Sequence, residues 1–293
     1  MKVVVSGCNG FVGSKVCQLL KDMNVEVYPI DITNGFDLSE PNAFEGIPAV
    51  DHFIHLANLV FVPMSYEQPY LFYRINYMTT LNALEYCRKT NAHLIYASSY
   101  IYGPAQYLPV DENHPTAPFN PYAETKVICE TLCQNYNKYF GVKSTILRPF
   151  NIYGAGQTGK LLIPEIVSQV KNGGEIHLKA SSPRRDFINV IDVARAFVAC
   201  LNDDSGCSAY NICSGKSYSI KELTDFFVKE AKNFGVELKF IFSEEERKSE
   251  VDETVGSYKK IHDKLGWEPT ISLEEGVRQI LEQEFKSLYC LES

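Results

Sequence analysis

Short apolar runs alternate with longer amphipathic stretches through the first half of the chain. The runs have the length of buried strands, and the longer stretches repeat their apolar residues with the period of a helix. Strands that alternate with helices predict a parallel sheet covered on both faces, and right-handed crossovers make it a doubly wound, Rossmann-type α/β sheet. The predicted strands are residues 2–6, 25–30, 52–56, 93–97 and 144–147, and the predicted helices are residues 11–21, 71–90 and 121–139.

The second half of the chain has a more mixed pattern. Its predicted helices are residues 161–171, 193–201, 220–233 and 273–285, and its predicted strands are residues 175–178, 209–212 and 237–241. We find no internal repeat and no low-complexity linker, so we expect a smaller mixed α/β lobe that packs against the first. The expected division is residues 1–163 and residues 164–293, with residues from about 187 to 214 packing back on the first lobe. The charge run at residues 244–248 is expected to be a surface turn.

Composition limits the classes of function. A formal net charge of −8 disfavours a nucleic-acid partner, and no apolar run is long enough to span a bilayer. Met1 leads directly into a predicted strand, so we expect no signal peptide. The nine cysteines lack paired CxxC spacing, and Cys129 and Cys133 have no further metal ligands nearby in the sequence. We therefore expect free thiols in a cytoplasmic protein and no metal site.

Three glycines lie between the first predicted strand and the first predicted helix. Gly7, Gly10 and Gly13 allow a tight turn, close approach of the backbone to phosphate, and close packing of the helix on the strand. The helix N-terminus at Phe11 and Val12 offers free N–H groups and a partial positive charge to an anion. This arrangement predicts a site for the pyrophosphate of a dinucleotide cofactor.

Asp31 ends the second predicted strand. An acidic side chain at this position can accept hydrogen bonds from an adenosine ribose, and the alternative is an aspartate that only caps its loop. No Lys or Arg occurs between Lys21 and Arg74, whereas a 2′-phosphate would require a nearby cation. The sequence therefore favours NAD(H) over NADP(H).

Tyr122 and Lys126 lie on the same face of a predicted helix, one turn apart. At about 4 Å and an effective dielectric of about 20, an ammonium stabilises a phenolate by about 4 kcal/mol, which would lower a tyrosine pKa from about 10 towards about 7. Such a tyrosine can exchange a proton with a sugar hydroxyl or ketone, and Ser98 is expected to hold the same oxygen. A second pair with this spacing, Tyr139 and Lys143, crosses a helix end, so its side chains need not face each other.

These residues form part of an ordered set of motifs that runs from Met1 to about Leu281. Together the motifs resemble the extended short-chain dehydrogenase/reductase family, which contains nucleotide-sugar epimerases, dehydratases and reductases. The motifs are the Gly7/Gly10/Gly13 turn, Asp37-Leu38, His55-Leu56-Ala57-Asn58, Asn76, Ser98 five residues before Gly103, Tyr122 with Lys126, Arg148-Pro149-Phe150-Asn151, Arg185-Asp186-Phe187, Tyr210-Asn211-Ile212 and Leu265-Gly266-Trp267-Glu268-Pro269.

The resemblance implies a role for each matching residue. Ser98, Tyr122 and Lys126 would form the catalytic triad. The cofactor would contact Asp37 through its adenine, Asn58 and Asn76 along its channel, and also Leu38, Leu56, Ala57, Tyr122, Lys126 and Pro149.

The resemblance also implies a nucleotide diphosphate-sugar substrate. Asn151, Arg185, Arg247 and Glu250 would hold its diphosphate and its base or ribose, and a planar arginine fork suits phosphate. The alternative for Arg247 and Glu250 is a surface charge cluster. Tyr100 is expected either to line the sugar pocket or to fill the core.

Departures from the family pattern narrow the reaction. Dehydratases of the family carry an acid pair directly after the triad hydroxyl, where this chain has Ser99 and Tyr100. The glutamate of decarboxylases is missing near Tyr100, and the cysteine and histidine of GDP-fucose synthase are missing too. Two reactions at C4 of the sugar remain: reduction of a 4-keto-6-deoxy nucleotide sugar, and 4-epimerisation by oxidation, rotation and re-reduction.

Three further features bear on this choice. Only residues 32–36 separate Asp31 from Asp37, which leaves no space for a strand that epimerases of the family often have there. The tail at residues 247–260 resembles enzymes that act on GDP-linked deoxysugars. Both features favour the reductase. The apparent NAD preference favours the epimerase, which retains that cofactor. A non-catalytic NAD-binding regulator is the third hypothesis, because a fold does not fix a function. The long helices at residues 71–90 and 121–139 are expected to pair in a homodimer, as in the family.

Overall fold

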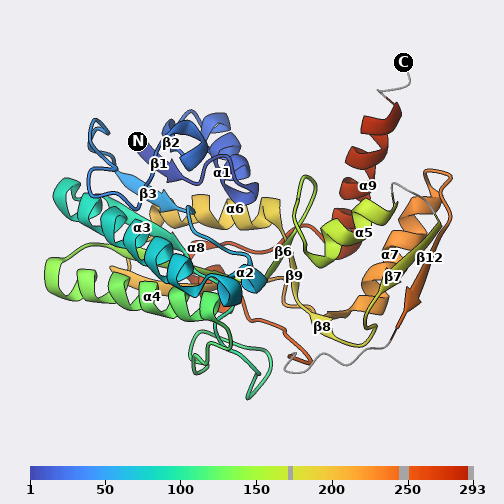
Figure 1. Ribbon diagram of the computed structural model, residues 1–293. Helices are drawn as coiled ribbons and strands as arrows, with labels where there is room; N and C mark the ends of the chain where they lie inside the picture. The colour runs from blue at the N-terminus through green and yellow to red at the C-terminus, as the bar shows by residue number, and fades with distance from the viewer. Residues whose placement is uncertain (171–173, 244–250, 290–293) are drawn as a thin grey trace.

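Six parallel strands form the central sheet of the larger lobe in the computed structural model, which describes residues 1–170, 174–243 and 251–289 (Figure 1). The order across the sheet is β10-β5-β4-β3-β1-β2. The bounds are β1 (Lys2–Ser6), β2 (Glu26–Ile30), β3 (His52–His55), β4 (His93–Ala97), β5 (Ser144–Pro149) and β10 (Cys207–Ile212). This topology confirms the doubly wound, Rossmann-type α/β fold that the sequence predicts.

Each face of the sheet is covered by two helices. Successive side chains of β1 point to opposite faces, so Val3 and Val5 belong to one core cluster and Val4 to another. All three valines are fully buried. The helices over the first face are α1 (Phe11–Asp22) and α6 (Val190–Ala199), and those over the second are α3 (Pro69–Thr90) and α4 (Pro121–Phe140).

Local signals set the ends of α4, the helix that carries the predicted catalytic pair. The Asn120 side chain accepts a hydrogen bond from the backbone N–H of Ala123 at 2.8 Å, and Pro121 takes the first helical position. Gly141 ends the helix with a φ of 71°, a conformation that glycine adopts without strain. The cap at Asn120 and Pro121 fixes the first turn of α4, where Tyr122 lies.

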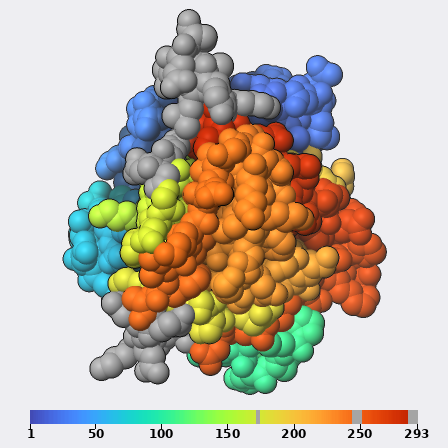
Figure 2. Space-filling model, turned by 90° about the vertical axis from the view of Figure 1, so that its right-hand side faces the viewer, coloured from blue at the N-terminus to red at the C-terminus, as the bar shows by residue number. Residues whose placement is uncertain are grey.

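The smaller lobe packs beside the larger one and has its own hydrophobic core. Figure 2 looks onto this lobe, with α7 and β12 in orange beside β7 in yellow-green. Its elements are α5 (Leu162–Val170), β7 (Gly174–Leu178), α7 (Ile220–Lys232), β12 (Leu238–Phe242) and α9 (Leu273–Tyr289). Among the helices of the described ranges, none has both the length and the apolarity to cross a bilayer.

Several short elements were not predicted, because two to seven residues carry too little periodicity to be read from a pattern. They are α2 (Val62–Glu67), α8 (Lys259–Leu265), β6 (Asn151–Tyr153), β8 (Arg184–Arg185), β9 (Phe187–Asn189), β11 (Tyr218–Ser219), and the 3-10 turns Ile32–Asn34 and Cys200–Asn202. The predicted charge run at 244–248 and the predicted helix end at 171 lie outside the described residues.

The chain returns to the larger lobe after it has entered the smaller one. β10 pairs with β5 at the edge of the central sheet, and Ile261 of α8 packs in the same core cluster as α1 and α6. Trp267 belongs to that cluster and donates its indole N–H to the backbone oxygen of Asp192 at 3.0 Å.

A buried carboxylate ties this returning segment to α6. Asp192 has an exposed fraction of 0 %. It accepts hydrogen bonds from the backbone N–H groups of Thr270 and Ile271 at 3.1 and 2.9 Å and from the Thr270 hydroxyl at 2.8 Å. Arg195, one turn along α6, completes the set with a 2.7 Å ion pair. The carboxylate is therefore desolvated and fully engaged.

We predict that Asp192→Ala lowers the free energy of unfolding by about 3 kcal/mol or more, because it leaves buried donors without an acceptor. Urea unfolding followed by circular dichroism measures the change. Asp263→Ala removes an exposed carboxylate that pairs with Lys259 on α8, and we expect it to leave the midpoint almost unchanged. Equal effects of the two substitutions would contradict the proposed role of Asp192.

Candidate active site

The glycine turn is closed by contacts that leave no room for side chains. Gly7 has a φ of 68°, and its backbone oxygen accepts a hydrogen bond from Gly10 N at 3.0 Å. A Cβ on Gly13 would lie 2.0 Å from the Gly7 oxygen, and a Cβ on Gly7 would lie 2.9 Å from the backbone nitrogen of Ala57. α1 starts directly after Gly10, so the N–H groups of Phe11, Val12 and Gly13 lie in its first turn. Helix start and strand ends thus meet closely enough to cradle a phosphate.

The two predicted adenosine-binding aspartates sit in tight loops. Asp31 accepts from the Thr33 backbone at 3.0 Å and from Asn9 N of the glycine turn at 3.1 Å. Burial acts to raise the pKa of Asp31, but the hydrogen bonds from Thr33 and Asn9 lower it overall. Hydrogen bonds from the Ser39 hydroxyl and backbone lower the pKa of Asp37. Asp31 therefore does cap its own loop, and it also links that loop to the glycine turn.

The loop after β3 is held by polar side chains beneath it. The Ser6 hydroxyl accepts from the backbone N–H groups of Leu56 and Ala57 at 3.2 and 3.3 Å. Asn76, which is fully buried on α3, accepts from Leu59 N at 2.8 Å and donates to the hydroxyl of Thr125 on α4 at 2.9 Å. Asn76 thus links the loop after β3 to α4. Two other predicted cofactor residues, Leu38 and Pro149, are buried.

Tyr122 and Lys126 lie near each other on α4, as their spacing predicts. The Lys126 ammonium is 5.7 Å from the centroid of the Tyr122 ring. Only 2 % of Lys126 is exposed, and its ammonium donates to Asn58 Oδ1 at 2.5 Å and to the backbone oxygen of Ala97 at 2.7 Å. It also lies 5.0 Å from the centroid of the Tyr96 ring.

The pKa values of the pair differ from the simple expectation. Burial lowers the pKa of Lys126 to about 8, against the opposing influence of Cys129 and Glu130. Burial raises the pKa of Tyr122, and a side-chain hydrogen bond with Ser99 acts in the opposite direction. The expected lowering of the Tyr122 pKa towards 7 is therefore not seen, because desolvation of the phenol dominates.

The structure gives the two neighbouring serines different surroundings. The Ser98 hydroxyl is buried and donates to Glu130 at 2.5 Å. The Ser99 side chain acts to lower the pKa of Tyr122. The family motif, five residues before Gly103, indicates Ser98. Both serines directly follow Ala97, the last residue of β4, so their position in the sequence does not separate them. After Ser99 come Tyr100 and Ile101, so an acid pair is missing there as well.

A buried ion pair lies behind the tyrosine and lysine. Arg148 on β5 contacts Glu130 through two nitrogens at 2.9 and 2.6 Å, and both residues are buried. Arg148 also donates to the Tyr102 hydroxyl at 2.8 Å, and that hydroxyl donates to Asn211 of β10 at 2.6 Å. Burial acts to lower the pKa of Arg148, but Glu130 raises it overall. The sequence analysis missed the role of Glu130; its position one helical turn after Lys126 was the available signal.

Three of the predicted substrate residues, Tyr100, Asn151 and Arg185, lie near one another around Asp186. Tyr100 stacks edge-on against Phe150 with ring centroids 5.1 Å apart, and its hydroxyl donates to the Gly103 backbone at 2.7 Å. Burial raises the pKa of Tyr100 to about 12, and the charge of Arg185 acts against it. Tyr100 therefore packs in an aromatic cluster and also lies within electrostatic reach of Arg185. The Asn151 amide donates to the Asp186 backbone at 3.1 Å.

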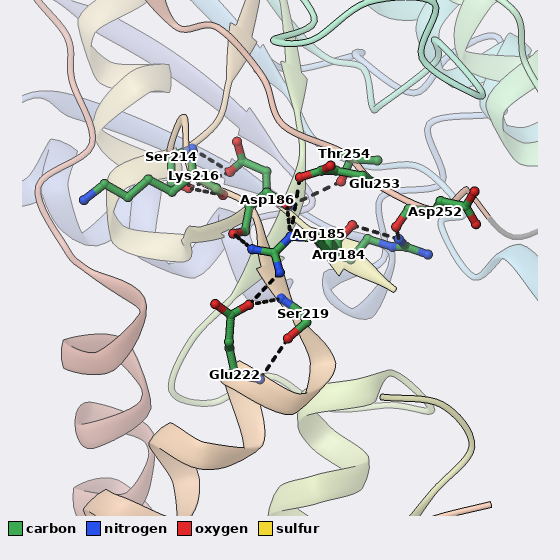
Figure 3. Close-up of polar contacts among 11 residues, drawn as sticks. Arg184, Arg185, Asp186, Ser214, Lys216, Ser219, Glu222, Asp252, Glu253 and Thr254 are labelled. Atoms are coloured by element: carbon green, nitrogen blue, oxygen red, sulfur yellow. Dashed lines mark hydrogen bonds and ion pairs between the residues drawn. The ribbon is translucent and has the colours of Figure 1, made fainter. Parts of the chain in front are cut away.

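Figure 3 shows Asp186 beside the two arginines, with Ser214 among its polar partners. The Asp186 carboxylate is fully buried and accepts from the Ser214 backbone and hydroxyl, both at 2.7 Å, from Gly215 N at 3.0 Å and from Gly256 N at 3.1 Å. Burial raises the pKa of Asp186 to about 6 despite these donors. Arg184 is bound to Glu222 at 2.9 Å, so the two neighbouring arginines have different surroundings.

Some predicted site residues lie elsewhere or outside the described ranges. Tyr139, of the second Tyr-x-x-x-Lys pair, is 64 % exposed in the last turn of α4, far along the helix from Tyr122. Arg247 and Glu250 lie outside the described residues.

The fold and this site define a class of protein: a dinucleotide-binding enzyme with a tyrosine and a lysine on a helix whose lysine contacts the end of a sheet strand. The profile of the "NAD dependent epimerase/dehydratase family" matches residues 3–213. This match shows that the chain belongs to that family.

Individual relatives are similar over nearly their whole length. GDP-6-deoxy-D-mannose reductase of Pseudomonas aeruginosa is 30 % identical, and the alignment covers 96 % of each chain. A putative UDP-glucose 4-epimerase of Methanocaldococcus jannaschii is 33 % identical over 95 % of this chain and 97 % of the relative. The solved structure of RMD from Pseudomonas aeruginosa complexed with NADPH has a TM-score of 0.89, with 29 % identity over 98 % of this chain and 99 % of that one. NAD(P)-dependent chemistry on nucleotide sugars is therefore the setting of this site.

We predict that Ser99→Ala lowers kcat more strongly than Ser98→Ala, by about tenfold or more, because one hydrogen bond to a developing charge contributes about 1.5–3 kcal/mol. Steady-state kinetics measures both variants. Ser98→Ala should act on the free energy of unfolding instead, since it removes a partner of buried Glu130. A kcat that falls only in the Ser98 variant would restore the original assignment.

Proposed function

We propose that this protein is an NAD(H)-dependent reductase that transfers hydride to C4 of a 4-keto-6-deoxy nucleotide sugar. The observation that carries the proposal is that Lys126, 5.7 Å from the Tyr122 ring, donates to Asn58 in the loop that packs against the glycine turn through Leu56 and Ala57. We assign Ser99 as the third member of this set. The similarity to a GDP-6-deoxy-D-mannose reductase supports the choice of reaction. The intact set of three side chains argues against a non-catalytic regulator.

The residues present fit a dinucleotide. A Cβ on Gly7 or Gly13 would clash with backbone atoms, so only glycine allows the tight turn through which the backbone can approach a pyrophosphate. The start of α1 would hold the pyrophosphate, Asp31 the adenosine ribose, and Asp37 with Leu38 the adenine side. Leu56, Ala57, Asn58, Asn76 and Pro149 would shape the channel towards Lys126. When bound, the nicotinamide supplies or accepts the hydride.

The chain's own residues manage the proton. In reduction, Tyr122 donates its phenolic proton to the oxygen on C4 as negative charge develops there. Ser99 holds the same oxygen by a hydrogen bond. Lys126, kept as a cation by its buried acceptors, stabilises the phenolate that Tyr122 becomes, and a proton from solvent then restores the phenol.

The substrate would lie between the lobes. Arg185 and Asn151 are proposed to hold its diphosphate, with Tyr100 at the sugar, and Arg247 and Glu250 are proposed contacts for the base or ribose. We propose residues 1–163 as the cofactor domain and residues 164–293 as the substrate lobe, with residues from about 187 to 214 packed on the former.

The second candidate reaction is 4-epimerisation, which the similarity to a putative UDP-glucose 4-epimerase favours. An epimerase would use the same three residues to oxidise and then re-reduce C4. The preference for NAD(H) rests on the Asp31 carboxylate, which would repel a 2′-phosphate; the related RMD structure contains NADPH. The eight described cysteines are free thiols, which supports a cytoplasmic location.

We predict that Tyr122→Phe binds NADH as the wild type does but loses turnover by at least about a hundredfold, because the proton donor is gone. The assay supplies 4-keto nucleotide sugars and ordinary nucleotide sugars, each with and without NADH or NADPH. Consumption of the reduced cofactor by the wild type identifies a reductase, and interconversion of sugars without consumption identifies an epimerase. Unchanged turnover of Tyr122→Phe would refute the assigned role.

A homodimer is part of the proposal. α3 and α4 present an apolar groove on which Tyr70 is 77 % exposed, and Tyr73 and Tyr77 are 37 % and 38 % exposed. The groove is lined by Tyr70, Tyr73, Arg74, Tyr77, Met78, Thr125 and Ile128. Exposed aromatic side chains gathered on one helix pair are typical of a face that meets a second copy.

We predict that the wild type elutes as a dimer in size-exclusion chromatography with light scattering, and that Tyr70→Asp with Tyr73→Asp gives a monomer. The two carboxylates would have to be desolvated in the interface. Tyr139→Asp, on an exposed tyrosine at the far end of α4, serves as the control and should stay dimeric. A monomeric wild type would contradict the prediction.

A further inference from the structure

The Lys126 ammonium is fixed by acceptors other than the tyrosine it is expected to serve. It has three N–H donors and almost no exposed surface, so each donor needs a partner inside the protein. Ala97 O, at 2.7 Å, is a backbone atom at the end of β4 and cannot be changed by substitution. Asn58 Oδ1, at 2.5 Å, is the side-chain acceptor that these contacts provide.

Asn58 is itself held in one orientation. Its amide nitrogen donates to the Thr79 hydroxyl at 3.0 Å. That hydroxyl donates in turn to the backbone oxygen of Asn76 at 3.3 Å, so it can offer only its lone pairs to Asn58. The nitrogen of Asn58 therefore faces Thr79, and the oxygen faces Lys126.

We propose that Asn58 is a positioning residue for Lys126: its carbonyl oxygen holds the ammonium charged and in place behind Tyr122, which goes beyond lining a cofactor channel. This inference rests on the proposed function only in that Lys126 serves Tyr122 and the bound cofactor.

Cys129, Glu130 and Cys133 on α4 also act to raise the pKa of Lys126, so Asn58 is one of several supports of its charge. Burial lowers the pKa of His55 to about 3 and raises that of Tyr96, so both are neutral near pH 7. Glu130 favours the ammonium, but its carboxylate is taken up by Arg148 and Ser98. The titratable groups that face Lys126 are His55 on β3, Tyr96 on β4, and Tyr122, Cys129, Glu130 and Cys133 on α4.

The Lys126 ammonium thus sits close to its titration point. Burial brings its pKa to about 8, so a modest loss of support would discharge it near neutral pH. A hydrogen bond to a charged group is enough to move a pKa by about one unit. The partial negative charge of the Asn58 oxygen is one such contribution.

The test measures the affinity for NADH from pH 6 to 10 in a Tyr122→Phe parent, which removes the titrating phenol. Affinity should fall as Lys126 loses its proton, with a midpoint near its pKa of about 8. We expect Asn58→Ala to move this midpoint down by about one pH unit and Asn58→Asp, which places a carboxylate beside the ammonium, to move it up. Thr79→Val removes one of the two acceptors of the Asn58 amide nitrogen and leaves the other, the backbone oxygen of Ala57 at 2.6 Å, so it should move the midpoint down by less.

The matched control is Asn137→Ala, because Asn137 is also an amide that donates to a backbone oxygen, near the far end of α4. Its midpoint should equal that of the parent. A change in affinity that is the same at every pH, or a parent without a midpoint, would overturn the inference. Because NADH binding is measured without a sugar, a failure of the proposed reaction appears separately, as a wild type that binds NADH but turns over no nucleotide sugar.

Discussion

A buried ammonium imposes the central constraint on this structure. Lys126 lies inside the protein and needs acceptors there, because an unpaired charge in the interior is too costly to keep. Its partners come from the loop after β3 and from the end of β4, while Lys126 itself lies on α4. Satisfying one side chain therefore holds three parts of the fold in register at the carboxyl edge of the sheet, where ligands of such sheets bind.

A second buried charge supports the first from behind. Glu130 and Arg148 neutralise each other, and Glu130 also takes up the hydroxyl of Ser98. The neighbouring serine, Ser99, acts instead on the pKa of Tyr122, which it lowers. Removing one member of such a pair leaves an uncompensated charge, so the pair is coupled to the geometry of the site as well as to stability. Tyr102 extends the network to β10, the outermost strand on one side of the sheet.

On the side of the site proposed for the substrate, the buried charge that needs partners inside the protein is a carboxylate. Asp186 is buried, and its four donors come from residues 214–215 and from Gly256, which are separate in the sequence. Asp186 directly follows Arg185 in the chain, so these contacts also fix the backbone beside that arginine. Buried charged groups with satisfied hydrogen bonds thus hold both the Lys126 side and the Asp186 side of the site. The apolar cores beneath them make the support rigid.

Sequence alone determined the features that are local. The five strands of the first half, the glycine turn and the common face of Tyr122 and Lys126 follow from periodicity and from spacing within one helical turn. The pairing of β10 as the sixth strand of the sheet does not. Tertiary structure decided the features that join distant residues. The choice between Ser98 and Ser99 depends on Glu130, 32 residues away from Ser98, and the acceptor of Lys126 is 68 residues away at Asn58. The pKa of Tyr122 also belongs to this second group, because burial, which spacing does not encode, outweighs the nearby ammonium.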